Sequence, residues 1–195
     1  MKFLGIKKVS QGKFLTKYDI AYETREHNLK NYEMVSRAKD LQTQEELYNS
    51  PTDSVVMIMT DPQGERLLLT REFRMALGRT VYGFPAGLVD PGESCEESAR
   101  RELWEETGLQ LKSIQRILPD SFNCVGITNE KSCVILGTAE GEFVKSTSDE
   151  EEIECRWYTR EEVRQLVEAD AFSARVQMFC YFWSGLDKTN LAEIL

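Results

Sequence analysis

Runs of branched and aromatic residues recur along the chain and predict strands. Six such runs are KFLTKYDIAYE, NYEMVSR, SVVMIMT, RLLLTREF, SCVILGTAEG and CRWY. The first two flank the polar stretch ETREHNLKN, which predicts a connecting turn between them. The third and fourth are joined by Asp61-Pro62-Gln63-Gly64, a sequence typical of a tight turn.

Three other stretches predict helices. Ser94 and Glu97 have the spacing of a capping box, and Gly108 is placed to end the helix that follows. Thr159 and Glu162 form a second box with the same spacing. A last, apolar helix is expected over ARVQMFCYFWSGL. Strands interspersed with helices predict a mixed α/β layered domain.

Composition and charge narrow the classes of partner. The chain has 195 residues, of which 41% are hydrophobic, enough for one well-formed core. Its net charge of -9 disfavours binding to nucleic acid or a membrane surface, because both are anionic. Its N-terminal apolar run is too short for a signal peptide, and no later run approaches a membrane span. We therefore expect a cytoplasmic protein with neither nucleic acid nor membrane as its partner.

The numbers and positions of the cysteines and the histidine restrict the kinds of catalytic and metal site that the chain can form. The five cysteines show no CxxC spacing and are odd in number, which indicates reduced thiols and suggests no zinc site. His27 is the single histidine, and its polar surroundings predict an exposed loop. Histidine-based triads and zinc sites are excluded unless His27 itself takes part. The chemistry must therefore rest mostly on carboxylates.

One predicted helix carries an unusual concentration of carboxylates. Glu102, Glu105 and Glu106 fall within an arc of about 100° on one helix face. The residues that share this side are small: Cys95, Ser98 and Ala99. Three converging carboxylates repel one another unless a hard divalent cation lies between them. The alternative is a solvated surface helix in which Arg101 pairs with Glu105 or Glu97.

The turn before this helix supports a built site. Asp90-Pro91-Gly92-Glu93 fits a tight turn that brings Gly87 back against the start of the helix. The chain here resembles the Nudix family, whose box has the pattern G-x5-E-x7-R-E-U-x-E-E-x-G-U with U apolar. The matching positions are Gly87, Glu93, Arg101, Glu102, Leu103, Glu105, Glu106, Gly108 and Leu109.

This resemblance implies a fold, a reaction and a metal site. The fold is the Nudix fold of the α/β (α+β) class, a mixed β-sheet sandwiched between helices, here with an N-terminal β-rich arm. The reaction is hydrolysis of a nucleoside diphosphate linked to another group. The implied metal is Mg²⁺, with Mn²⁺ as the alternative, held by Glu102, Glu105, Glu106 and the carbonyl of Ala86. Glu93 and Arg101 match the pair that braces the loop against the helix.

The wider chain is similar to the ADP-ribose pyrophosphatase branch of that family. REFR followed by GFPAG resembles the approach to the box in these enzymes, and Arg74 matches a phosphate-binding arginine. A salt bridge at the strand end is the alternative for Arg74. The resemblance also implies that Phe14 and Tyr32 stack on the adenine, although both could instead belong to the core.

Further site residues follow from the same resemblance. Arg37 would reach a phosphate, and Glu33 would lie near the base edge. The run SDEEEIEC resembles an acidic loop that supplies a base or an extra metal ligand; Glu151 is the first choice and Glu152 the second. A solvated loop tip is the alternative. Two positions differ from the ADP-ribose pattern: Val125 replaces a proline, and Gly83 replaces an acidic residue.

We therefore expect residues 1–49 to form an arm for dimerisation and base binding, and residues 50–195 to form the hydrolase domain. In these relatives the arm crosses to a second subunit, which implies a homodimer with composite sites. The expected reaction is Mg²⁺-dependent hydrolysis of ADP-ribose to AMP and ribose 5-phosphate. The alternatives are another nucleoside diphosphate sugar, such as GDP-mannose or an ADP-sugar, and a non-catalytic binding module.

Overall fold

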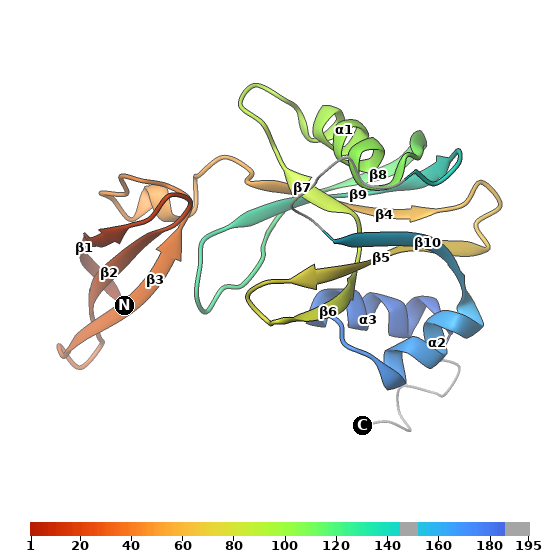
Figure 1. The fold of residues 1–195 in the computed structure, drawn as a ribbon. Helices are drawn as coiled ribbons and strands as arrows, with labels where there is room; N and C mark the ends of the chain where they lie inside the picture. The colour runs from red at the N-terminus through yellow and green to blue at the C-terminus, as the bar shows by residue number, and fades with distance from the viewer. Residues whose placement is uncertain (145–151, 186–195) are drawn as a thin grey trace. The chain divides into compact units, whose positions relative to one another are not determined.

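The computed structural model describes residues 1–144 and 152–185, which form two compact units (Figure 1). The first unit comprises Met1–Ser54 and Pro119–Cys133. The second comprises Val55–Leu118 and the chain from Val134 onward. The division of roles between residues 1–49 and 50–195 stays a prediction.

The first unit contains a three-stranded antiparallel sheet in the order β1-β2-β3. Its strands are β1 (Lys2–Gln11), β2 (Thr16–Glu23) and β3 (Leu29–Ser36). Alternate side chains of β2 and β3 form a small core with the segment that follows them: Tyr18, Ile20, Met34 and Leu41. The two strands predicted around the polar turn are confirmed. His27 lies in that turn, exposed and with a positive φ of 62°.

A seven-stranded sheet, most of which belongs to the second unit, has the main order β10-β5-β4-β9-β8, with β6 paired to β5 and β7 paired to β4. The strands are β4 (Ser54–Thr60), β5 (Arg66–Arg74), β6 (Arg79–Gly83), β7 (Ala86–Leu88), β8 (Gln110–Phe122), β9 (Lys131–Glu140) and β10 (Ile153–Thr159). The predicted strands over SVVMIMT, RLLLTREF, SCVILGTAEG and CRWY are present as β4, β5, β9 and β10.

Three helices cover this sheet (Figure 1). Helix α1 (Cys95–Thr107) contacts β7 and β10, whereas α2 (Arg160–Ala169) and α3 (Ala174–Trp183) pack against each other on the opposite face. The core under α2 and α3 contains Leu67 and Leu69 of β5. The expected fold, a mixed sheet between helices with a β-rich N-terminal arm, is confirmed.

Both predicted capping boxes are formed. Ser94 Oγ accepts a hydrogen bond from Glu97 N, and the Glu97 carboxylate accepts one from Ser94 N at 2.8 Å. Gly108 ends α1 in the left-handed conformation, with φ 76°, and its N–H donates to Trp104 O. Helix α1 therefore begins and ends where the local sequence satisfies its free backbone groups.

Two long strands, β1 and β8, were not predicted. In β8 only Leu111 is buried, so the strand lacks the alternation of apolar and polar residues that identifies a half-buried strand. It forms because it pairs with β9 at the end of the sheet, a contact between distant parts of the chain. Within residues 1–144 and 152–185, every helix is too short or too polar to cross a membrane.

Candidate active site

The turn before α1 has the predicted geometry. Gly92 has φ 92°, a conformation that side chains disfavour, and Glu93 N donates to Asp90 O at 3.0 Å. The turn places the Glu93 carboxylate beside α1, where it accepts a hydrogen bond from the buried Ser98 hydroxyl at 2.6 Å. The loop and the helix are thus joined at a fixed position.

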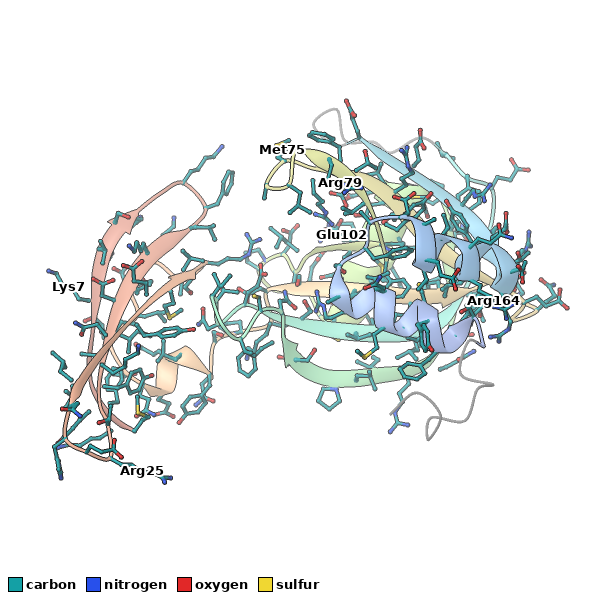
Figure 2. The ribbon with its side chains drawn as sticks, turned by 90° about the horizontal axis from the view of Figure 1, so that it is seen from below. Lys7, Arg25, Met75, Arg79, Glu102 and Arg164 are labelled. Carbon is teal, nitrogen blue, oxygen red and sulfur yellow. The ribbon has the colours of Figure 1, made fainter. Side chains whose placement is uncertain are left out.

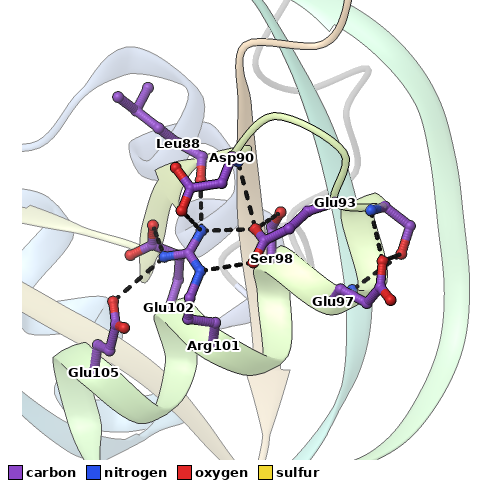
Figure 3. A network of polar contacts seen from close by, with 9 residues as sticks. Leu88, Asp90, Glu93, Glu97, Ser98, Arg101, Glu102 and Glu105 are labelled. Atoms are coloured by element: carbon purple, nitrogen blue, oxygen red, sulfur yellow. Dashed lines mark hydrogen bonds and ion pairs between the residues drawn. The ribbon is translucent and has the colours of Figure 1, made fainter.

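Arg101 lies at the centre of this junction (Figure 3). Its Nε and Nη2 donate to the two oxygens of Glu93 at 3.0 and 2.8 Å, and Nη2 also donates to Leu88 O at 3.0 Å. Its Nη1 donates to Glu102 at 2.8 Å and to Glu105 at 3.3 Å. The expected contact between Glu93 and Arg101 is present. The alternative pairing with Glu105 is also present, but as one part of this larger network.

The network shifts the pKa values of Glu93 and Arg101. Hydrogen bonds from Arg101 hold the pKa of Glu93 at about 2, with Ser98 adding to the effect. The pKa of Arg101 is raised in return, chiefly by its hydrogen bonds to Glu93. Both groups are therefore charged at neutral pH, and the pair is a charge-assisted, bidentate contact, the strongest class of side-chain hydrogen bond.

Gly87 and Glu102 lie in direct contact. A Cβ atom at Gly87 would overlap the carboxyl group of Glu102, so no other residue fits here without displacing that carboxylate. The glycine of the motif thus gives the Glu102 carboxylate its present position, and its φ is not in the left-handed region. Strand β7 and helix α1 approach each other at this point, which brings the Glu102 carboxylate against the backbone of β7.

Glu106 is a buried carboxylate one helical turn further along. It is 7% exposed and accepts a hydrogen bond from Ala86 N at 3.2 Å. On its other side, the Cys155 thiol donates to the Glu106 carbonyl at 3.5 Å. Burial, with Glu106 and Glu72 adding, raises the pKa of Cys155 to about 12, so this thiol is protonated at neutral pH.

The structure thus places Glu102 and Glu106 against Gly87 and Ala86, while Glu105 faces Arg101. As the side chains stand, the described residues contain no group of three His, Cys, Asp or Glu that could hold a metal ion. Glu102 and Glu105 instead meet at Arg101 Nη1. The carboxylates of Glu102, Glu105 and Glu106 are thus oxygen donors whose positions are set in part by hydrogen bonds to other protein groups. Their role in binding a metal stays a prediction.

The predicted base-binding aromatics lie in the first unit. Phe14 is 68% exposed and Tyr32 is 39% exposed, so the alternative that they belong to the core is wrong. Tyr32 Oη donates to Gly126 O at 2.5 Å. The β2–β3 register pairs Tyr32 with Ile20, which lies four residues, or roughly 13 Å, from Thr16 at the start of β2. Phe14 lies beyond that end, in the turn between β1 and β2. The structure does not bring these two rings together within one chain.

The predicted polar substrate residues all have ionic partners. In the first unit, Arg37 Nε donates to Glu130 at 2.6 Å, and Glu33 pairs with Lys17 at 2.9 Å. In the second unit, Arg74 pairs with Glu72 at 2.7 Å, which is the strand-end salt bridge considered as the alternative for Arg74. None of these pairs excludes binding, because each arginine keeps an exposed part: 36% for Arg37 and 50% for Arg74.

The acidic loop is described only at its end. Glu151 lies outside the described residues. Glu152 is exposed, and its carbonyl accepts a hydrogen bond from Phe73 N at 3.1 Å, which attaches this end of the loop to β5. The role of either glutamate as a base stays a prediction.

Two residues beside the site escaped the sequence analysis: Glu72 and Cys155. The Cys155 thiol donates to the Glu106 carbonyl, and the charge of Glu72 helps to raise the pKa of that thiol. One signal was available in the sequence, since Glu72 and Arg74 are two apart on a predicted strand and therefore share a face. The position of Cys155 depends on the pairing of β10 with β5, which no local pattern specifies.

Comparison with known proteins identifies the class. The NUDIX domain family matches residues 50–179, about two thirds of the chain, and the chain belongs to this family. The family assignment made from the box is thereby confirmed. A solved structure described as an ADP compounds hydrolase aligns with a TM-score of 0.71 at 20% identity, covering 94% of this chain and 92% of that one. At this identity the likeness shows the fold.

Sequence relatives carry several activities in their names. ADP-ribose pyrophosphatase of Saccharomyces cerevisiae is 35% identical over 101 residues, covering 49% of this chain and 43% of the yeast protein. NAD-capped RNA hydrolase NUDT12 of Macaca fascicularis is 34% identical over 110 residues, covering 56% of this chain and 22% of its own length. The matched region spans less than half the length of these curated relatives.

Proposed function

We propose that this protein hydrolyses the diphosphate bond of nucleoside diphosphate-linked compounds, with ADP-ribose as the substrate and AMP and ribose 5-phosphate as products. The observation that carries the proposal is the close approach of Glu102 and Glu106 to the backbone of Ala86 and Gly87. This arrangement collects hard oxygen ligands in the loop–helix junction that the family pattern marks.

The donor set fits a hard divalent cation. Mg²⁺ and Mn²⁺ prefer carboxylate and carbonyl oxygens, and the residues that would hold one are Glu102, Glu105, Glu106 and the carbonyl of Ala86. Gly87 leaves the Glu102 carboxylate room against the loop. Glu105 can join this set by releasing Arg101, which retains Glu93 and Leu88 O as partners. When bound, the cation neutralises the diphosphate and makes a bound water more acidic.

The protein's own groups supply position and charge. The Glu93–Arg101 pair holds the loop against α1, so that Glu102 and Glu106 keep their places when substrate binds. Arg74 offers its exposed guanidinium to a phosphate oxygen. Glu151 or Glu152 accepts the proton of the attacking water, whose oxygen forms a bond to phosphorus as the bridging P–O bond breaks.

Base binding is assigned to the exposed rings of the first unit. An aromatic ring at the surface stacks on any base, so Tyr32 suits an adenine. Phe14 is too far from Tyr32 in the same chain for both to stack on one base. A sandwich of the two rings therefore needs two copies of the chain, in agreement with a homodimer in which each arm serves the partner's site.

The test is a substrate panel with Mg²⁺ or Mn²⁺, in which product formation from ADP-ribose, GDP-mannose, an ADP-sugar, NADH and NAD-capped RNA is compared. We expect ADP-ribose to give the highest kcat/KM, with AMP as one product. Cleavage of NAD-capped RNA faster than of ADP-ribose would indicate that NAD-capped RNA is the substrate, which is the activity named for the NUDT12 relative. Binding without turnover of any compound would indicate a non-catalytic module and would overturn the proposal.

Two matched variants test the site itself. Glu106→Gln keeps the shape of the side chain but removes one charge, and we expect activity to fall at least about a hundredfold with the fold intact. Glu96→Gln, on the same helix and paired with Arg100, should retain near wild-type activity. Equal activity of both variants would show that Glu106 has no special role.

A further inference from the structure

The two faces of the β10–β5–β6 part of the sheet carry different chemistry. Directly paired residues of antiparallel strands share a face, and Cys155, Thr70 and Gly83 are paired in this way. Cys155 contacts Glu106 of α1, so this face is the one covered by α1. The opposite face contains Tyr82, which stacks on Phe172 at 5.3 Å between ring centroids.

Arg74 and Arg79 are direct cross-strand partners at the open end of the β5–β6 ladder. They lie on the α1 face, because Arg74 is four residues from Thr70 and side chains two apart share a face. Their Cβ atoms are about 5 Å apart in such a pair. The same geometry puts them about 13 Å along the strand from Thr70.

This pair places two positive charges opposite each other, an arrangement that destabilises a sheet unless the charges are compensated. Glu72 neutralises Arg74 at 2.7 Å. Arg79 is exposed and makes no ion pair or side-chain hydrogen bond with any residue in the described ranges. Figure 2 marks Arg79 beside Met75, at the two ends of the loop that joins β5 and β6. Among the described residues, the Arg79 guanidinium on the α1 face thus has no ionic partner.

From this placement, and resting on the proposed function, we propose that Arg79 is a substrate-binding residue that acts with Arg74 as a two-arginine site for the diphosphate. Two planar guanidinium groups side by side suit the oxygens of adjacent phosphates, because each can donate two parallel hydrogen bonds. The anion would relieve the repulsion between the two arginines. The acidic net charge of the chain makes such a local cationic pair useful for attracting a dianion.

The chain provides a matched control in Arg71. Like Arg74, it lies on β5, and its exposure of 47% is close to the 50% of Arg74. Arg71 pairs with Tyr82 in register and therefore lies on the opposite face, where it contacts Glu154 at 3.4 Å. Arg79→Gln should raise KM for ADP-ribose, or for the best substrate of the panel, about tenfold or more, with kcat changed less. Arg79→Lys should recover part of the loss, and Arg71→Gln should stay within about twofold of wild type.

Thermal unfolding without ligand separates binding from structure. Removal of one of two opposed charges should leave the melting temperature of Arg79→Gln equal to or above that of wild type. A fall of several degrees would assign Arg79 a structural role and would overturn the proposal. Kinetic constants of Arg79→Gln equal to those of Arg71→Gln would overturn it too.

A binding measurement keeps the proposal distinct from the proposed function. If the wild type cleaves no compound of the panel, the proposed function fails, and Arg79 is then tested by calorimetry with inorganic pyrophosphate and Mg²⁺. Weaker binding by Arg79→Gln than by Arg71→Gln would support the two-arginine site. Equal binding by both variants, or no binding by the wild type, would count against it.

Discussion

Arg101 and Glu93 form a bidentate pair, with Nε–Oε1 at 3.0 Å and Nη2–Oε2 at 2.8 Å. The pair joins the turn before α1 to the middle of the helix. Because Arg101 also donates to Leu88 O and Glu102, a single guanidinium connects the strand, the turn and the acidic helix face. Strand β7, which contains Gly87, and the turn that follows it are therefore held in place by ionic contacts as well as by packing.

This pair predicts a specific dependence of stability on acid. The pKa of Glu93 is about 2 in the folded protein, below its usual value of 4.5. In the window between these values the unfolded chain binds a proton that the folded chain does not, so stability is lost as the pH falls through it. Glu93→Gln should be less stable at pH 7 and should lose less stability between pH 5 and pH 2.5. Denaturant unfolding of both proteins across this range measures the difference, and identical acid dependence would contradict it.

Substitution of Gly87 tests the close approach to Glu102. Gly87→Ala inserts a Cβ into the position of the Glu102 carboxyl group, which must move. A displacement of about 1 Å at a catalytic site can cost about a hundredfold in rate, and we expect a loss of that order. Gly5→Ala is the control, since a Cβ there meets no atom within 4 Å. Steady-state kinetics that show full activity in Gly87→Ala would rule out a role for the Glu102 position.

Tyr32 allows stacking to be separated from hydrogen bonding. Tyr32→Phe removes the hydroxyl that donates to Gly126 O but keeps the ring, so we expect little change in KM. Tyr32→Ala should weaken binding of adenine compounds by about 1–3 kcal/mol, with a smaller effect on kcat, because stacking holds ground and transition states alike. KM for ADP-ribose and for GDP-mannose would be measured for both variants. Equal losses in Tyr32→Phe and Tyr32→Ala would show that the hydroxyl, and not the ring, is what matters.

The N-terminal cap of α1 gives a prediction about stability alone. Ser94→Ala removes the side-chain acceptor for Glu97 N and should lower the free energy of unfolding by about 1 kcal/mol. Ser173 precedes α3 but makes no side-chain cap hydrogen bond. Ser173→Ala should therefore change the free energy of unfolding by less than about 0.5 kcal/mol. Urea unfolding of the two variants provides the comparison. A larger loss for Ser173→Ala would contradict the assignment of the caps.

Some features were determined by the sequence alone, because they depend on neighbours within a few residues. The boundaries of α1 follow from the capping box at Ser94 and the left-handed Gly108, and both are satisfied locally. The turn before the helix follows from Pro91 and Gly92. The same local spacing identified the family, since the fixed positions of the box all lie between Gly87 and Leu109, from the short strand β7 through one turn to the end of one helix.

Other features were decided only by the tertiary structure, because they depend on contacts between distant segments. Strand β8 carries no clear pattern and forms by pairing with β9. The Arg74–Arg79 pair exists because an antiparallel register places two residues of separate strands opposite each other. The separation of Phe14 from Tyr32 is likewise a matter of register between β2 and β3. Strand register is set by packing and pairing over the whole sheet, so no short stretch of sequence could specify it.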